Sequence, residues 1–198
     1  MEKKRIAVLV SGGGTNLQAL FDAQDSGIIT DGEIVLVISS NDKAYALTRA
    51  ANRNVKTAVF SGAKMGHANA EQAIHDLLIE DKIDLVVLAG YMSILSENFT
   101  AKWPEKIINV HPALIPSFCG KGYYGLYVHK CALEYGVKVT GATVHFVNEV
   151  PDGGRIIAQK AVDVRPGDTP EVLQRRVMEQ AEWIILPRAV QDVCAAMN

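Results

Sequence analysis

Two polar side chains stand two residues apart at the end of an apolar run. Asn109 and His111 follow Ile107-Ile108, and Pro112 comes directly after them. Alternate residues of a strand point to the same face, so the two side chains would lie about 7 Å apart along one face. An amide donor can stabilise a developing oxyanion, and an imidazole beside it can carry a proton. The pair therefore suits acyl transfer; the alternative is a strand end that hydrogen-bonds to a neighbouring loop.

A run of three glycines forms a second candidate site. The segment Ser11–Asn16 reads Ser-Gly-Gly-Gly-Thr-Asn and follows an apolar run. Glycines let the backbone approach an anion closely, and the N-terminus of the next helix offers free N–H groups. Leu17 stands where a dinucleotide-binding loop has its third glycine, and the lysine of a P-loop is missing. The loop favours the terminal phosphate of a mononucleotide-like substrate; the alternative is a glycine turn with Thr15 as helix cap.

The turn Asp152-Gly153-Gly154 is a third candidate, and it follows the strand-like segment Gly141–Phe146. An aspartate in such a turn is commonly an Asx-turn residue. It would act in catalysis only if it faced His111, where its charge would raise the pKa of the imidazole and fix the orientation of the ring. The sequence leaves both roles open. The histidines on helical or loop stretches are predicted to lie at the surface: His67, His75 and His129.

The elements that must position these residues alternate along the chain. Short apolar runs predict strands at residues 5–10, 33–39, 57–60, 84–88, 107–110, 140–147 and 156–164. Helices are predicted at 16–24, 43–52, 68–80, 97–102, 126–135 and 169–197. This α/β alternation predicts a Rossmann-like, mostly parallel twisted sheet with helices on both faces. Only the turn 148–155 separates the last two strands, so we expect a C-terminal antiparallel hairpin extension.

The composition limits the classes of function. The 198 residues carry a net charge of -2, which argues against a broad basic surface for nucleic acid. The apolar run at the N-terminus is too short for a signal peptide, and no stretch has the length of a membrane span. The three cysteines form neither a disulfide framework nor a zinc pattern. We expect a cytoplasmic protein that binds a small molecule rather than nucleic acid or a membrane.

Three segments together resemble the folate-dependent formyltransferase family. They are Asn109-Val110-His111-Pro112-Ala113-Leu114-Ile115-Pro116, Gly141–Val147 and Asp152-Gly153-Gly154, and the resemblance runs essentially from end to end. It implies that the formyl group of 10-formyltetrahydrofolate, a co-substrate, passes to the amine of glycinamide ribonucleotide. The products would be formylglycinamide ribonucleotide and tetrahydrofolate, as in the third step of purine synthesis. The resemblance implies no metal.

The same resemblance assigns roles to matching positions. It implies that Asn109 and His111 stabilise the tetrahedral intermediate, that Asp152 keeps His111 protonated and assists proton transfer, and that His145 supports them. The substrate-binding residues implied are Gly14, Thr15, Asn16 and Glu182. The folate-binding residues implied are Met92, Ser93, Ile94, Leu95, Asn109 and Val147. We expect one domain over residues 1–198, with a phosphate-binding half at 1–106 and a catalytic and folate-binding half at 107–198.

Departures from the family pattern touch binding rather than the cluster around His111. Ser93 stands where the family often has arginine, and residues 67–73 lack another common arginine. The stretch 120–127 is longer than usual, and the spacing near Glu182 differs by about one residue. The alternatives are a 10-formyltetrahydrofolate hydrolase, a methionyl-tRNA formyltransferase and a non-catalytic nucleotide-binding module; length disfavours the first two. The sequence leaves the oligomeric state open, and a homodimer is one expectation.

Overall fold

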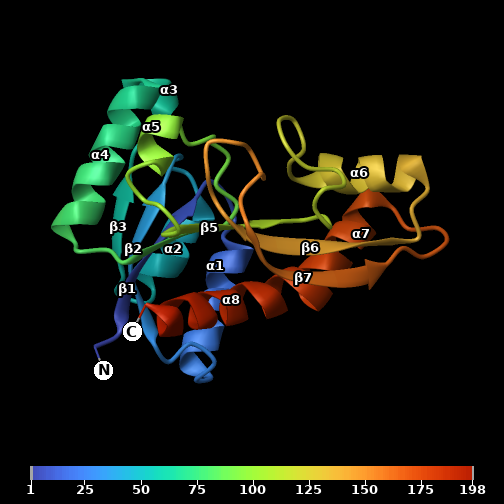
Figure 1. The fold of residues 1–198 in the computed structure, drawn as a ribbon, viewed down its shortest axis with the longest axis horizontal. Coiled ribbons are helices and arrows are strands. Elements are labelled where there is room, and N and C mark those ends of the chain that lie inside the picture. The colour runs from blue at the N-terminus through green and yellow to red at the C-terminus, as the bar shows by residue number, and fades with distance from the viewer. Residues whose placement is uncertain (1, 198) are drawn as a thin grey trace.

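A single mixed sheet forms the centre of the molecule (Figure 1). The computed structural model describes residues 2–197, and within them seven strands lie in the order β3-β2-β1-β4-β5-β6-β7. The strands are β1 (Lys4–Val10), β2 (Gly32–Ser39), β3 (Lys56–Val59), β4 (Leu85–Leu88), β5 (Ile107–His111), β6 (Val139–Phe146) and β7 (Ile156–Asp163). Each matches a strand predicted from the apolar runs.

The sheet is parallel from β3 to β5 and antiparallel beyond it. The predicted α/β fold and the hairpin of β6 and β7 are therefore confirmed. The antiparallel part begins one strand earlier than the hairpin alone would require, because β6 also runs against β5. Between these strands α6 (Leu126–Tyr135) packs on α7 (Pro170–Val177) instead of crossing back over the sheet. The chain therefore enters β6 beside the carboxyl end of β5 and returns along it.

Helices cover both faces of the sheet. The others are α1 (Thr15–Asp25), α2 (Tyr45–Ala51), α3 (Gly62–Met65), α4 (His67–Glu80), α5 (Glu97–Thr100) and α8 (Trp183–Ala196). The short α3 was not predicted, and the predicted helix at 169–197 is interrupted by a π-helical turn, η1 (Met178–Glu182). No helix within residues 2–197 has the length and apolar character that crossing a membrane requires.

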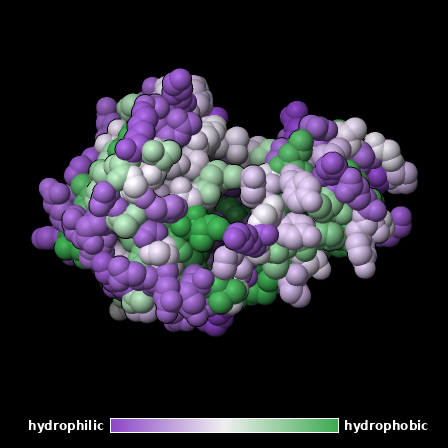
Figure 2. All heavy atoms as spheres, turned by 90° about the horizontal axis from the view of Figure 1, so that it is seen from above, coloured by the Kyte–Doolittle hydropathy of each residue, from purple (hydrophilic) through white to green (hydrophobic). Residues whose placement is uncertain are grey.

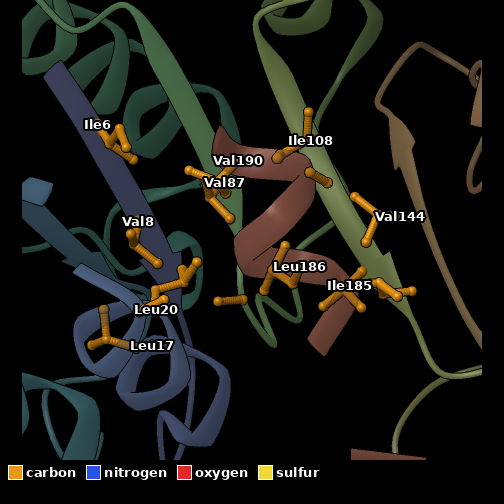
Figure 3. Packing of buried hydrophobic residues seen from close by; sticks show 14 of the residues in the cluster. Ile6, Val8, Leu17, Leu20, Val87, Ile108, Val144, Ile185, Leu186 and Val190 are labelled. Carbon is orange, nitrogen blue, oxygen red and sulfur yellow. The ribbon is translucent and has the colours of Figure 1, made fainter. Parts of the chain in front are cut away.

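Alternation along β1 divides the core into two layers. Ile6 and Val8 belong to the layer with α1, α2 and α8, whereas Ala7 and Leu9 belong to the layer with α4 and α5. Both layers bury side chains of a parallel strand, which explains why the strands are apolar along their whole length. Figure 3 shows α8 lying across the sheet, with Val190 beside Val87 of β4.

The outer part of the sheet forms a smaller lobe. Figure 1 shows β6 and β7 extending away from the parallel strands, with α6 and α7 packed beside them. The sheet itself continues through β4, β5 and β6 without a break. The division of the chain at residues 106 and 107 therefore stays a prediction.

Replacement of Leu186 by alanine tests whether α8 holds the sheet together. Leu186 is completely buried in the layer beneath β4 and β5, so we expect Leu186→Ala to lower the free energy of unfolding by roughly 2–5 kcal/mol. Ile184, on the same helix, is 36% exposed, and Ile184→Ala should cost less than about 1 kcal/mol. Urea unfolding at equilibrium measures both. Equal losses would contradict the role given to α8.

Candidate active site

Pairing of β5 with β6 brings the side chains of Asn109, His111, His145 and Asp152 together. Asn109 stands opposite His145 in the antiparallel register, and its Nδ2 lies 3.2 Å from His145 Nε2. Asp152 completes the cluster from the turn after β6: Oδ2 lies 3.5 Å from His111 Nδ1, and Oδ1 lies 3.5 Å from His145 Nε2. Each carboxylate oxygen therefore faces one imidazole.

Thr143 fixes the chain where it leaves β5. It stands opposite His111 in the register. Its hydroxyl donates to the carbonyl oxygen of Ala113 at 2.7 Å and accepts from the N–H of Ile115 at 3.1 Å. A proline at position 112 cannot donate to the ladder, so the strand ends there. The threonine then holds the departing segment, which keeps the end of β5, and with it His111, in place.

The turn that carries Asp152 is tightly constrained. Asp152 has a φ of 57°, in the left-handed region, where a non-glycine residue is uncommon. The N–H of Gly153 donates to Val150 O at 2.9 Å, and a Cβ at Gly154 would overlap the carbonyl oxygen of Phe146. The N–H of Gly120 donates to Asp152 Oδ2 at 2.8 Å. Asp152 is thus held by contacts on two loops, which goes beyond an ordinary turn residue.

The surroundings of Asp152 keep its carboxyl ionised. Burial alone would raise its pKa, but the hydrogen bond with His145, the charge of His111 and the N–H of Gly120 together hold the pKa below its ordinary value. Hydrogen bonds to the charged form of a carboxyl favour that form. A carboxylate is therefore present at neutral pH between the two imidazoles.

Opposing effects act on the pKa of His111. Burial lowers its pKa, while the charge of Asp152 and the carbonyl oxygen of Phe118 act to raise it; the net pKa lies below the ordinary value. This differs from the prediction that Asp152 keeps the ring protonated, because the side chain is only 4% exposed and desolvation is the larger effect. His111 Nε2 lies 2.8 Å from Phe118 O, and Nδ1 faces Asp152. Both neighbours are acceptors, so the ring has a built-in place for a second proton.

The glycine loop lies at the N-terminus of α1, where β1 and β4 are neighbours. Gly14 has a φ of 73°, and a Cβ there would lie 2.7 Å from Ala46 Cβ, so packing of α2 on the loop requires glycine. The helix begins at Thr15 with Gly14 as its N-cap. The alternative in which Thr15 caps the helix is therefore wrong, and its hydroxyl lies 3.9 Å from Met178 Sδ.

Asn16 and Glu182 form a buried pair beside this loop. Asn16 Nδ2 donates to Glu182 Oε2 at 2.7 Å, and Asn16 Oδ1 has no hydrogen-bond partner. Burial raises the pKa of Glu182, and the bond from Asn16 opposes the increase. Glu182 ends the π-helical turn η1. Such a turn accommodates an extra residue within an α-helix, which accounts for the one-residue difference in spacing that the sequence has near Glu182.

Ser11 links the glycine loop to the segment after β4. Its hydroxyl oxygen accepts from the N–H of Met92 at 2.9 Å and lies 2.7 Å from Ser40 Oγ. The order of the strands reverses between β1 and β4, and ligands of such sheets bind outside the carboxyl ends of the strands at this point. The two segments therefore border one binding region.

Two adjoining cavities open on the cluster. One of about 420 Å³ is lined by Asn109, His111 and Asp152 together with the segments 90–94 and 120–125. The other, of about 120 Å³, is lined by Asn109, His145 and Asp152 together with residues 93–95 and 147–151. Seen from above in Figure 2, the surface is hollowed near the middle of the molecule.

The structure distributes the predicted binding residues between these cavities and the glycine loop. Ser93, Ile94 and Asn109 line both cavities, Met92 lines the larger one, and Leu95 and Val147 line the smaller one. The residues predicted for the substrate gather outside both cavities, around the start of α1: Gly14, Thr15, Asn16 and Glu182. A further cavity of about 440 Å³ lies between α4 and α5, and no member of the His111 cluster lines it. Among residues 2–197 no group of three or more His, Cys, Asp or Glu side chains is placed to hold a metal ion.

Sequence reasoning missed two contacts of the cluster and the burial of one histidine. The backbone groups of Phe118 and Gly120 bind His111 and Asp152, and backbone partners carry no sequence signal. The prediction that His129 lies at the surface is wrong, because its side chain is fully buried and neither ring nitrogen has a partner. Its spacing from Ala132, which is also buried, places both on one face of α6 and could have indicated this.

A mixed α/β sheet that brings an amide, two imidazoles and a carboxylate together at β5, β6 and the turn after β6 suits group-transfer chemistry. Residues 4–190 match the model of the formyl transferase family, so the chain belongs to that family. It is 43% identical to phosphoribosylglycinamide formyltransferase of Haemophilus influenzae over 95% of this chain and 86% of that one. It is 38% identical to the chloroplastic phosphoribosylglycinamide formyltransferase of Arabidopsis thaliana, over 97% of this chain and 66% of that one.

Other relatives are longer, and solved structures share the fold. The chain is 43% identical to the human trifunctional purine biosynthetic protein adenosine-3 and spans 19% of its length. It resembles the structure of glycinamide ribonucleotide transformylase 1 from Symbiobacterium toebii with a TM-score of 0.90 and 40% identity, over 98% of this chain and 89% of that one. A formyltetrahydrofolate deformylase from Pseudomonas syringae has a TM-score of 0.87 and 26% identity, and the chain covers 62% of it.

Replacement of His129 tests the cost of its burial. Burial, and then the charge of His111, lower the pKa of His129 to about 4, so the unfolded chain takes up the proton first as the pH falls. We expect the free energy of unfolding to decrease by about 2 kcal/mol between about pH 7 and pH 5 through this residue. In His129→Leu that part of the decrease should vanish, as measured by urea unfolding at both pH values. His67→Leu, at an exposed histidine, should keep the original pH dependence. An unchanged decrease in His129→Leu would contradict this account.

Proposed function

We propose that the protein transfers the formyl group of 10-formyltetrahydrofolate to the amine of glycinamide ribonucleotide, giving formylglycinamide ribonucleotide and tetrahydrofolate. The observation that carries the proposal is the cluster of Asn109, His111 and Asp152 at the wall of a cavity of about 420 Å³. Membership of the formyl transferase family supports a folate-type donor, and the phosphoribosylglycinamide formyltransferases and purine biosynthetic proteins among the relatives support the acceptor and a place in purine synthesis.

Asn109 supplies the fixed donor of the reaction. The amine nitrogen forms a bond with the formyl carbon, and the carbonyl oxygen becomes an oxyanion in a tetrahedral intermediate. Asn109 Nδ2 lies 3.2 Å from His145 Nε2, a contact that fixes the position of the amide. An N–H of the amide is then available to the oxyanion, and a donor held in this way costs no reorganisation when charge develops. His111 supports the same oxygen when its ring is protonated.

His111 and Asp152 handle the proton. The attacking amine must lose a proton, and the folate nitrogen must gain one when its bond to the formyl carbon breaks. A buried imidazole with a lowered pKa is neutral and ready to take the first proton. Asp152 stabilises the imidazolium that forms, because its carboxylate faces Nδ1. The same ring then returns the proton to the leaving nitrogen.

Each substrate has its own binding region: the ribonucleotide binds at the glycine loop, and the folate binds in the smaller cavity. The phosphate of the ribonucleotide binds at the N-terminus of α1, through the N–H groups of Gly14, Thr15 and Asn16, and Glu182 binds the ribose. The folate ring system occupies the cavity lined by Leu95 and Val147, next to Asn109. The cluster lies between the two, which brings the amine to the formyl carbon.

A hydrolase is the second candidate, since a formyltetrahydrofolate deformylase shares the fold. Water would replace the amine in that reaction. The glycine loop and the Asn16–Glu182 pair favour an acceptor that carries a phosphate and hydroxyl groups, which hydrolysis does not need. We place the protein in the cytoplasm. The homodimer stays a prediction, because the structure describes one copy of the chain.

The proposal is tested by the acceptor dependence of the reaction. The protein is incubated with 10-formyltetrahydrofolate, with and without glycinamide ribonucleotide, and tetrahydrofolate release is followed by absorbance. We expect release only with the amine, and His111→Ala should lower kcat by roughly 10²- to 10⁴-fold because the proton carrier is lost. Release without the amine would indicate hydrolysis, no release would indicate a binding module, and full activity of His111→Ala would sink the mechanism.

Replacement of Glu182 by glutamine separates ribose binding from catalysis. The amide oxygen can still accept from Asn16 Nδ2, but the second carboxyl oxygen, the proposed acceptor for a ribose hydroxyl, becomes an NH₂ group that cannot accept. We expect KM for glycinamide ribonucleotide to rise by roughly 10-fold, with kcat and the KM for folate little changed. Steady-state kinetics with each substrate varied gives these values. A fall in the melting temperature with unchanged KM would instead assign Glu182 to the core alone.

A further inference from the structure

A single basic side chain lines the cavities beside the cluster. Of the residues around the two adjoining cavities, Lys121 alone is a lysine or arginine, while Glu149 and Asp152 carry negative charge. Within residues 2–197 no hydrogen bond or ion pair involves the ammonium group of Lys121. An unpaired ammonium group at the wall of a binding cavity is available to an anionic group of a ligand.

The backbone holds Lys121 at a defined place. The carbonyl oxygen of Gly120 accepts from the N–H of Tyr123 at 3.1 Å, and Gly122 has a φ of 97°. Lys121 and Gly122 are thus the central residues of a turn with glycine at the left-handed position. The N–H of Gly120 is bound to Asp152 at 2.8 Å. The lysine is therefore one residue away from a group that is fixed to the cluster.

Aromatic contacts anchor the far side of this turn. The Tyr123 ring lies 6.4 Å from the ring of Phe118 and 6.0 Å from that of Tyr127. Tyr123 and Tyr124 also line the larger cavity, across from Met92 and Ile94. The mouth of the cavity therefore offers apolar and aromatic walls, and Lys121 adds one positive charge.

We propose that Lys121 binds the glutamate carboxylate of the folate co-substrate, a proposal that rests on the proposed function. In a folate the glutamate is joined to the formyl-bearing nitrogen through one benzoyl group. When that nitrogen lies at Asn109 and His111, the benzoyl ring lies between the aromatic walls and the carboxylate lies at the mouth. Lysine is a compact charge on a flexible stem, which suits a carboxylate that stays partly in water. Ser93, in the opposite wall, provides no charge for this purpose.

Truncation of the co-substrate tests this assignment. Lys121→Met removes the charge and keeps most of the stem. We expect it to raise KM for 10-formyltetrahydrofolate roughly fivefold, as for an exposed ion pair, and to leave KM unchanged for the carboxamide of 10-formyltetrahydropteroate, which has neither the glutamate nor a carboxylate. Lys121→Arg keeps the charge and should keep most of the difference in KM between the two co-substrates. Lys130→Met is the matched control, since Lys130 is an exposed lysine that pairs with Glu134 on α6, and both KM values should stay as in the original protein.

Two outcomes would overturn the assignment. An equal increase in KM for both folates would mean that Lys121 shapes the loop, and an increase in KM for glycinamide ribonucleotide alone would assign it to the phosphate. The dissociation constants of tetrahydrofolate and of the carboxamide of tetrahydropteroate, measured by calorimetry, separate this inference from the proposed reaction. If the glutamate strengthens binding to the original protein but not to Lys121→Met, Lys121 binds the glutamate even if no formyl group is transferred. If the formyl group is transferred but neither KM nor binding depends on the glutamate, the assignment of Lys121 is wrong and the proposed reaction stands.

Discussion

The antiparallel pairing of β5 with β6 is the constraint on which the site depends. In the parallel part of the sheet, the carboxyl ends of all strands lie at the same edge. Each of these strand ends can place one or two side chains in a site at that edge. Because β6 runs against β5, His145 near the end of β6 stands opposite Asn109, and the turn after β6 folds back toward His111. The cluster therefore consists of two side chains from one strand, one from its antiparallel neighbour and one from the turn that follows. A parallel β6 would have carried His145 and Asp152 to a different register.

Most of the fold follows from the pattern of apolar runs, and the site follows only in part. The continuous apolar runs and the helical stretches between them predicted the sheet with helices on both faces, and the short turn after residue 147 predicted the hairpin. Asn109 and His111 were visible because two polar residues interrupt a buried strand. Asp152 was indistinguishable from a turn residue, since its role depends on the N–H of Gly120, 32 positions away. The π-helical turn that ends at Glu182 was invisible for a similar reason: whether one extra residue in the spacing forms a bulge depends on how the turn packs against β6 and β7.

Opposing effects on the pKa of His111 support the proposal that one ring serves both halves of the transfer. Burial favours the neutral ring, while Asp152 and the carbonyl of Phe118 favour the imidazolium. The net pKa of His111 lies below its ordinary value, so in the proposed transfer the ring starts neutral and Asp152 stabilises the proton that the ring takes up. Asp152 can do this because its hydrogen bonds with His145 and Gly120 already favour its ionised form. A carboxylate held only by His111 would share the proton and lose its own charge.

The proposed binding groups for the two substrates lie on different sides of the cluster. The glycine loop and Glu182 lie on the side of β1 and α1, whereas the cavities with Leu95 and Val147 lie on the side of β4 and β6. The hydrogen bond from Met92 to Ser11 fastens these sides together at the point where the strand order reverses. In the proposed reaction, two substrates that approach from these sides meet at the ends of β5 and β6. Strand order sets this meeting point, so residues 121–125, which follow the N–H that binds Asp152, can vary in charge and change which ligands are held without moving the groups that act on them.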